Sequence, residues 1–197
     1  MKPSKLVSAF VIAAATTAAG FSAPSKASAE EIYFIRGFAN VWSTGITQMA
    51  NQLRSRGCNA KAVSNGAWNG IARDIIKRSK SGQVSYPIII LGHSTGGQEA
   101  PLMANTLGAA GVSTALVIGV DPGFAPPKPF NHGAKRVVNY WIAGSARGNP
   151  YRAGSGFDGT IENINIRSFT NADHIEIDDD PRVQSRIVEL AAATAGC

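Results

Sequence analysis

The sequence predicts an α/β fold, a three-layer sandwich in which helices cover both faces of a mostly parallel, six-stranded sheet. Short apolar runs alternate along the chain with segments whose apolar residues recur at helical spacing. Some of these runs, such as residues 115–120, are apolar throughout, as expected for parallel strands buried on both faces. Regular alternation of strands and helices indicates a parallel sheet between two helical layers.

In the first part of the chain, strands are expected over residues 32–35 and 60–63. The segment between them places four apolar residues at i, i+3, i+4 and i+7, which is one face of a helix that ends at Gly57. These residues are Ile46, Met49, Ala50 and Leu53. A second amphipathic helix is expected around residues 71–76 and frays into the polar stretch 77–82.

Further strands are expected over residues 88–91, 115–120, 137–143 and 161–169. A helix over residues 97–107 follows the first of these strands. The last helix is expected to begin after Asp180 as its N-cap, with Pro181 at the first helical position. The missing N–H of proline costs no hydrogen bond there, because the first N–H groups of a helix have no partner within it. We find no internal repeat and no linker, so a single domain is expected.

The first 29 residues have the pattern of a signal peptide. Two lysines precede an apolar stretch over residues 6–21, and the small residues 27–29 form a cleavage site of the A-x-A kind. Threonines and a glycine make this stretch a poor membrane span, although an uncleaved anchor is the alternative. We therefore expect export to the periplasm or the medium, a mature domain of residues 30–197, and no integral membrane span after cleavage.

Removal of the leader changes the charge of the chain. It takes three lysines and no acidic residue, so the formal net charge falls from +6 to +3. No run of Lys or Arg exceeds two residues. This pattern argues against nucleic acid as a partner.

Two cysteines remain, Cys58 and Cys197. Export favours a disulfide between them, and two unpaired thiols are the alternative, since the sequence does not place their Cα atoms. Neither cysteine has a neighbourhood of metal ligands, so we expect no metal and no cofactor.

The most informative motif is Gly92-His93-Ser94-Thr95-Gly96, between a buried strand and a helix. A strand that ends in Gly-x-Ser-x-Gly and turns into a helix resembles the nucleophile elbow of α/β hydrolases. The two glycines are required there because side chains would collide with the neighbouring strand and helix. The pattern alone is weak, so the chain must also supply a base, an acid and an oxyanion hole.

A serine nucleophile needs a general base, and the chain has three histidines. His174 follows the last expected strand, which is where this architecture places the base. His132, in a proline-rich loop, is the fallback. His93 is not proposed as the base, because its backbone is part of the elbow turn itself.

The acid that orients the base is expected to be Asp121, which stands directly after the strand 115–120. The order Ser94, Asp121, His174 matches the order Ser, Asp, His of α/β hydrolases. The usual position is one strand later, which leaves Asp158 as the competitor. Asp173 is too close to His174 in the sequence to fold back easily.

The oxyanion hole requires two backbone N–H groups. One is expected from Thr95, directly after the nucleophile, and the other from Phe38 in the loop after the first strand. Many relatives carry histidine where this chain has Arg36, which puts the local hydrogen bonding of that loop in question.

Over residues 31–195 the chain resembles a minimal α/β hydrolase of the lipase, esterase and thioesterase type, as an exported bacterial member. The carriers of the resemblance are Ile35-Arg36-Gly37-Phe38, the elbow with Gly97, Val120-Asp121-Pro122, and the segment from Asp173 to Asp178. The resemblance implies an enzyme without a cap domain, a serine hydrolase that cleaves an ester or thioester through an acyl-enzyme. Its partner would be a small-molecule or lipid-like acyl substrate.

Two other functions stay open at this point. One is a non-catalytic binding or cell-envelope interaction protein that keeps the fold without the chemistry. The other is an acyltransferase that passes the acyl group to an acceptor other than water. The elbow has no lysine at the P-loop position, which argues against a phosphate-binding loop.

Overall fold

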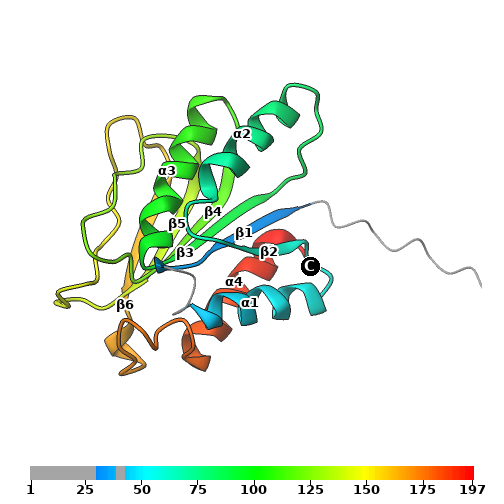
Figure 1. Ribbon diagram of the computed structural model, residues 1–197. Helices are drawn as coiled ribbons and strands as arrows, with labels where there is room; N and C mark the ends of the chain where they lie inside the picture. Colours follow the sequence, from blue (N-terminus) through cyan, green and yellow to red (C-terminus); the bar gives the residue numbers. More distant parts are fainter. Residues whose placement is uncertain (1–29, 39–42) are drawn as a thin grey trace, which may run out of the picture.

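A computed structural model describes residues 30–38 and 43–197, so the expected signal peptide lies outside the described residues. Its centre is a six-stranded sheet in the order β2-β1-β3-β4-β5-β6, in which every neighbouring pair is parallel (Figure 1). The strands are β1 (Glu31–Ile35), β2 (Ala60–Val63), β3 (Ile88–His93), β4 (Thr114–Val120), β5 (Ala134–Trp141) and β6 (Thr160–Asn165). The predicted six-stranded, mostly parallel sheet is therefore confirmed.

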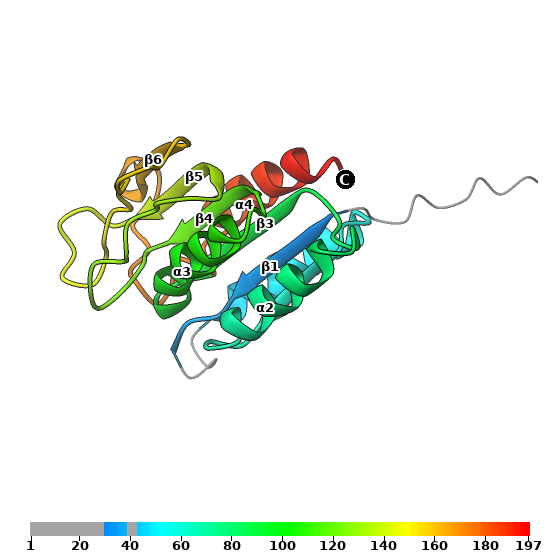
Figure 2. The ribbon, with the colours of Figure 1, turned by 90° about the horizontal axis from the view of Figure 1, so that it is seen from above.

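Helices cover both faces of this sheet, as Figures 1 and 2 show. They are α1 (Thr44–Ser55), α2 (Trp68–Ser79), α3 (Thr95–Ala109) and α4 (Pro181–Ala195). One apolar core joins α1 and α4 to one face, and a second joins α2 and α3 to the other. Alternate residues of β1 enter the two cores, with Phe34 in the first and Ile35 in the second. The three-layer sandwich is confirmed.

The strand expected over residues 161–169 is wrong at its C-terminal end. Strand β6 ends at Asn165, and a 3₁₀ helix, Ile166–Ser168, follows. The side chain of Asn165 accepts a hydrogen bond from the N–H of Arg167 and so caps this turn. A capping asparagine therefore ends the strand, although the apolar residues after it continue the strand pattern.

Helix α3 contains Pro101, which has no N–H to donate to the carbonyl of Gly97 one turn earlier. The hydroxyl of Tyr151 donates to that carbonyl instead, at 2.6 Å. Tyr151 lies buried in the long loop between β5 and β6, and its N–H and C=O both bond the side chain of Asn163 in β6. The loop is thereby fixed to α3 and to the edge of the sheet.

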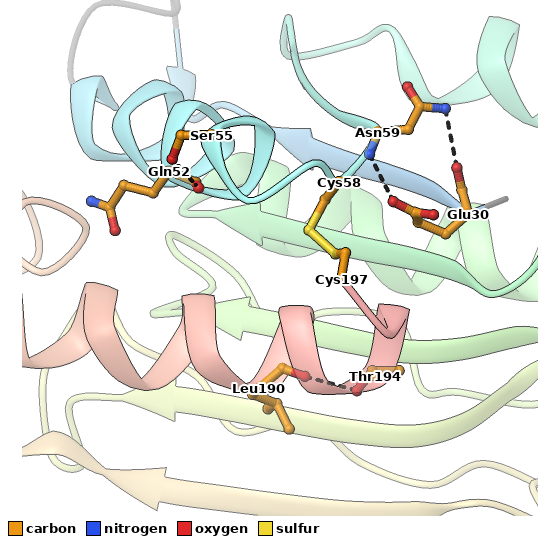
Figure 3. The surroundings of a disulfide bond; sticks show 8 residues. All are labelled: Glu30, Gln52, Ser55, Cys58, Asn59, Leu190, Thr194 and Cys197. Carbon is orange, nitrogen blue, oxygen red and sulfur yellow. Dashed lines mark hydrogen bonds between the residues drawn. A yellow bond between two sulfur atoms is a disulfide. The ribbon is translucent and has the colours of Figure 1, made fainter. Parts of the chain in front are cut away.

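Cys58 and Cys197 form a disulfide, which answers the question that the sequence left open (Figure 3). Their Cα atoms lie 5.5 Å apart across a sequence separation of 139 residues. The bond joins the C-terminus of α4 to the turn between α1 and β2. Within residues 30–38 and 43–197, these cysteines and Glu30 form the one group of three close metal-ligand side chains, and the S–S bond occupies its sulfur atoms.

None of the helices in the part of the chain that the structure describes is both long and apolar enough to cross a membrane.

Candidate functional site

Ser94 occupies a strained turn between β3 and α3. Its φ of 54° lies in the left-handed region, and its N–H donates to the carbonyl of Val120 in β4 at 3.0 Å. A Cβ on Gly92 would lie 2.0 Å from the carbonyl oxygen of Gly96, and one on Gly96 would lie 2.4 Å from that of Ile35. Both glycines are therefore required for the sharp turn that raises Ser94 at the end of its strand.

The hydroxyl of Ser94 is the first member of a buried hydrogen-bonded chain. Its Oγ lies 3.0 Å from Nε2 of His174, and Nδ1 of His174 lies 2.7 Å from Oδ2 of Asp121. Because a carboxylate accepts, Nδ1 carries the proton and Nε2 presents its lone pair to Ser94. The structure thus brings together the three residues that the sequence proposed as nucleophile, base and acid.

Asp121 is held in place by its own surroundings. It follows β4 directly, with φ of 42°, and is completely buried. Its second oxygen, Oδ1, accepts a hydrogen bond from the N–H of Ile142 at 2.9 Å. The two competing residues lie elsewhere: Asp158 is exposed in the loop before β6, and His132 is exposed in the loop before β5.

Gly123 packs against this hydrogen-bonded chain, although no pattern in the sequence points to it. A Cβ at this position would lie 2.8 Å from Cε1 of His174 and 3.1 Å from Oγ of Ser94. The side-chain amide of Gln98 in α3 donates to the carbonyls of Gly123 and Ala125. Gln98 therefore holds the loop of Gly123 against Ser94 and His174.

The two proposed oxyanion donors border the same region. Thr95 is the first residue of α3, so its N–H has no partner within the helix. The neighbouring N–H of Gly37 already donates to Ser43 Oγ at 2.8 Å, whereas Phe38 lines the cleft at Ser94. The guanidinium of Arg36 donates to Thr47 Oγ1 in α1 at 3.0 and 3.1 Å, so this side chain braces the start of the loop.

A cleft of about 210 Å³ opens above Ser94 and His174. Its rim carries three exposed apolar side chains, with 66% of Phe38, 65% of Phe124 and 43% of Ile175 accessible. Arg147 also lines this cleft. Arg147 and His174 also border an adjoining polar hollow of about 440 Å³, together with Arg167 and Asp173. The site therefore has an apolar side and a polar side that meet at His174.

A second buried polar cluster lies behind the first, and its members were not expected to have a role. His93 Nδ1 lies 2.8 Å from Ser43 Oγ, and Nε2 lies 3.0 Å from the carbonyl oxygen of His174. Burial lowers the pKa of His93 to about 4. Oδ1 of Asp178 lies 3.5 Å from His93 Nδ1. Burial, with a further contribution from Asp179, raises the pKa of Asp178 to about 7.

Together, the sheet topology and the turn at Ser94 define an α/β-hydrolase fold. Among solved structures, "RedJ with PEG molecule bound in the active site" has a TM-score of 0.55 at 10% identity, over 89% of this chain and 99% of that chain. The NocB thioesterase domain from the nocardicin cluster has a TM-score of 0.49 at 13% identity, over 87% and 96%. No protein-family model matches the sequence, and no curated protein matches it significantly. At 10% identity the likeness to the RedJ structure concerns the fold alone.

Proposed function

We propose that this protein is an exported serine hydrolase that cleaves an ester or thioester. The observation that carries the proposal is the buried chain from Ser94 through His174 to Asp121, with spacings of 3.0 and 2.7 Å. A hydroxyl, an imidazole and a carboxylate in this order are the parts needed to make serine a nucleophile at neutral pH.

In the proposed reaction, His174 Nε2 takes the Ser94 proton as Oγ attacks the acyl carbon. The developing oxyanion is held by the N–H groups of Thr95 and Phe38, each contributing on the order of 3 kcal/mol in comparable sites. His174 then gives its proton to the departing alcohol or thiol. Water, deprotonated by His174, cleaves the acyl-enzyme and restores the serine. Asp121 orients the imidazole and stabilises its positive charge throughout.

The lining of the cleft suggests where the acyl chain and the leaving group of the substrate bind. Phe38, Phe124 and Ile175 offer apolar surface to an acyl chain of short or medium length. The polar hollow with Arg147 and Arg167 lies on the other side of His174 and suits the leaving group. Export is supported by the leader pattern of residues 1–29 and by the disulfide, which is typical of oxidising compartments.

An activated fluorophosphonate probe tests the function directly. The purified protein is expected to form a covalent phosphonyl adduct on Ser94, seen as a mass increase and mapped by peptide analysis. Ser94→Ala is the control and should take no label. A folded wild-type protein that remains unlabelled would favour the non-catalytic binding protein, and acyl transfer to added alcohols or thiols in place of water would favour the acyltransferase.

Phe124→Ala is expected to alter the preference for acyl chain length. Loss of the ring removes apolar surface at the mouth of the cleft, so kcat/KM for an octanoyl ester should fall about tenfold. The acetyl ester is the internal control, since its chain is too short to use this apolar surface, and its kcat/KM should fall much less, reflecting only the lost edge contact between the Phe124 and His174 rings. Equal losses for both esters would contradict the assignment of this rim to the acyl chain.

A further inference from the structure

One side chain, His93, joins the two segments on which the proposed reaction depends. On one side its Nδ1 meets Ser43 Oγ at 2.8 Å, and Ser43 in turn accepts the N–H of Gly37 at 2.8 Å. On the other side its Nε2 meets the carbonyl oxygen of His174 at 3.0 Å. Ser43 and His93 are almost completely buried. The chain of bonds therefore runs from the oxyanion loop to the loop of the general base.

The direction of each bond follows from the acceptors. A carbonyl oxygen can only accept, so Nε2 of His93 carries the proton. In the neutral ring Nδ1 is then an acceptor, so the hydroxyl of Ser43 donates a hydrogen bond to it, while the oxygen of that hydroxyl accepts from the N–H of Gly37. The low pKa of His93, which is caused first by burial, keeps the ring in this neutral form. Its tautomer is the opposite of the one in His174.

Asp178 closes the cluster from the side of α1. Its Oδ2 accepts from the N–H of Ile46 at 3.3 Å, and its main-chain carbonyl accepts from Gln184 at 2.9 Å. Its Oδ1 is fully buried and has no hydrogen-bond partner among the described residues. Burial and then Asp179 raise its pKa to about 7, so the neutral acid, which places no negative charge beside the Nδ1 lone pair, is accessible near neutral pH.

We propose that His93 is a positioning residue for the proposed reaction, which holds the main chain of His174 and, through Ser43, the main chain of Gly37 and Phe38. The inference rests on the proposed function. It explains why a histidine stands inside the elbow, where the residue type is otherwise free. It also explains how the loop of His174, which has no strand or long helix of its own, keeps the imidazole aligned with both Ser94 and Asp121.

The test compares two amides at position 93. In His93→Asn the amide stands near the place of Nδ1 and cannot reach the His174 carbonyl, whereas in His93→Gln an N–H returns near the place of Nε2. We expect kcat for a p-nitrophenyl ester to fall about 10²-fold in His93→Asn, because a displacement near 1 Å has an effect of this size. KM should change far less, and His93→Gln should recover most of the loss.

Two further variants keep the result interpretable. His132→Asn is the matched control, since this histidine is exposed, and it should behave as wild type. Ser43→Ala cuts only the arm to Gly37 and should lower kcat about tenfold, which gives a second test if His93→Asn does not fold. Melting temperatures are measured for every variant.

The outcomes separate the two proposals. A wild-type protein that takes no fluorophosphonate label refutes the proposed function itself. If the wild type is labelled and His93→Asn turns over equally fast, only the positioning role is refuted. The same holds if His93→Gln is as slow as His93→Asn at equal thermal stability, or if Ser43→Ala leaves kcat unchanged.

Discussion

Asp121→Asn is expected to lower kcat for a chromogenic ester about 10⁴-fold, the size of effect that the same change has in the serine protease triad. The amide has nearly the shape of the carboxylate, but it can donate to Nδ1 of His174 and so favour the wrong tautomer. The base would then present a proton to Ser94 where a lone pair is needed. Kinetics at saturating substrate measure the loss.

The matched control for this variant is Asp158→Asn. Asp158 is exposed and stands in the loop before β6, so its replacement should leave kcat within about twofold of wild type. The reverse result, with Asp158→Asn slow and Asp121→Asn normal, would move the acid of the triad to the later loop and overturn the reading of the structure.

Removal of the disulfide should have the largest effect on stability. Cys58→Ala combined with Cys197→Ala frees a loop across 139 residues, and the chain-entropy model gives a loss of about 4 to 5 kcal/mol in the free energy of unfolding. For a domain of this size, the melting temperature should fall by about 10 to 15 °C. Calorimetry or circular dichroism measures the shift.

Wild-type protein in a reducing buffer is the control and should melt close to the double variant. Esterase activity at 25 °C should survive in both, because the disulfide lies at the end of the sheet opposite to Ser94. A melting temperature that reduction leaves unchanged would show that the bond does not form or contributes nothing.

Much of the fold could be predicted from the sequence because its signals are local. Buried parallel strands such as β3 and β4 are apolar throughout, and α1 carries an unbroken apolar face. The end of β6 could not be predicted in the same way. There the side chain of Asn165 caps a 3₁₀ turn, so the strand ends at Asn165 even though the apolar residues typical of a strand continue after it.

The same difference between local signals and contacts made by the fold applies to the candidate site. Ser94, Asp121 and His174 follow from motif and chain order, and the structure places them within hydrogen-bond distance, while their catalytic roles stay predictions. Gly123 and Asp178 could not be found, because their places depend on which loops meet above the sheet. His93 was visible as part of the elbow, but only the fold shows that its side chain reaches Ser43.

The bond between Tyr151 and the proline-interrupted helix α3 has a consequence for redesign. It fixes the middle of the loop between β5 and β6, and Asn139 adds a bond to the carbonyl of Asn149 at 3.0 Å. Residues 143–147, which border the polar hollow, lie between these anchors and the end of β5. Exchange of this segment is therefore expected to alter the preference for the leaving group in the proposed reaction, with the hydrophobic core and the elbow untouched.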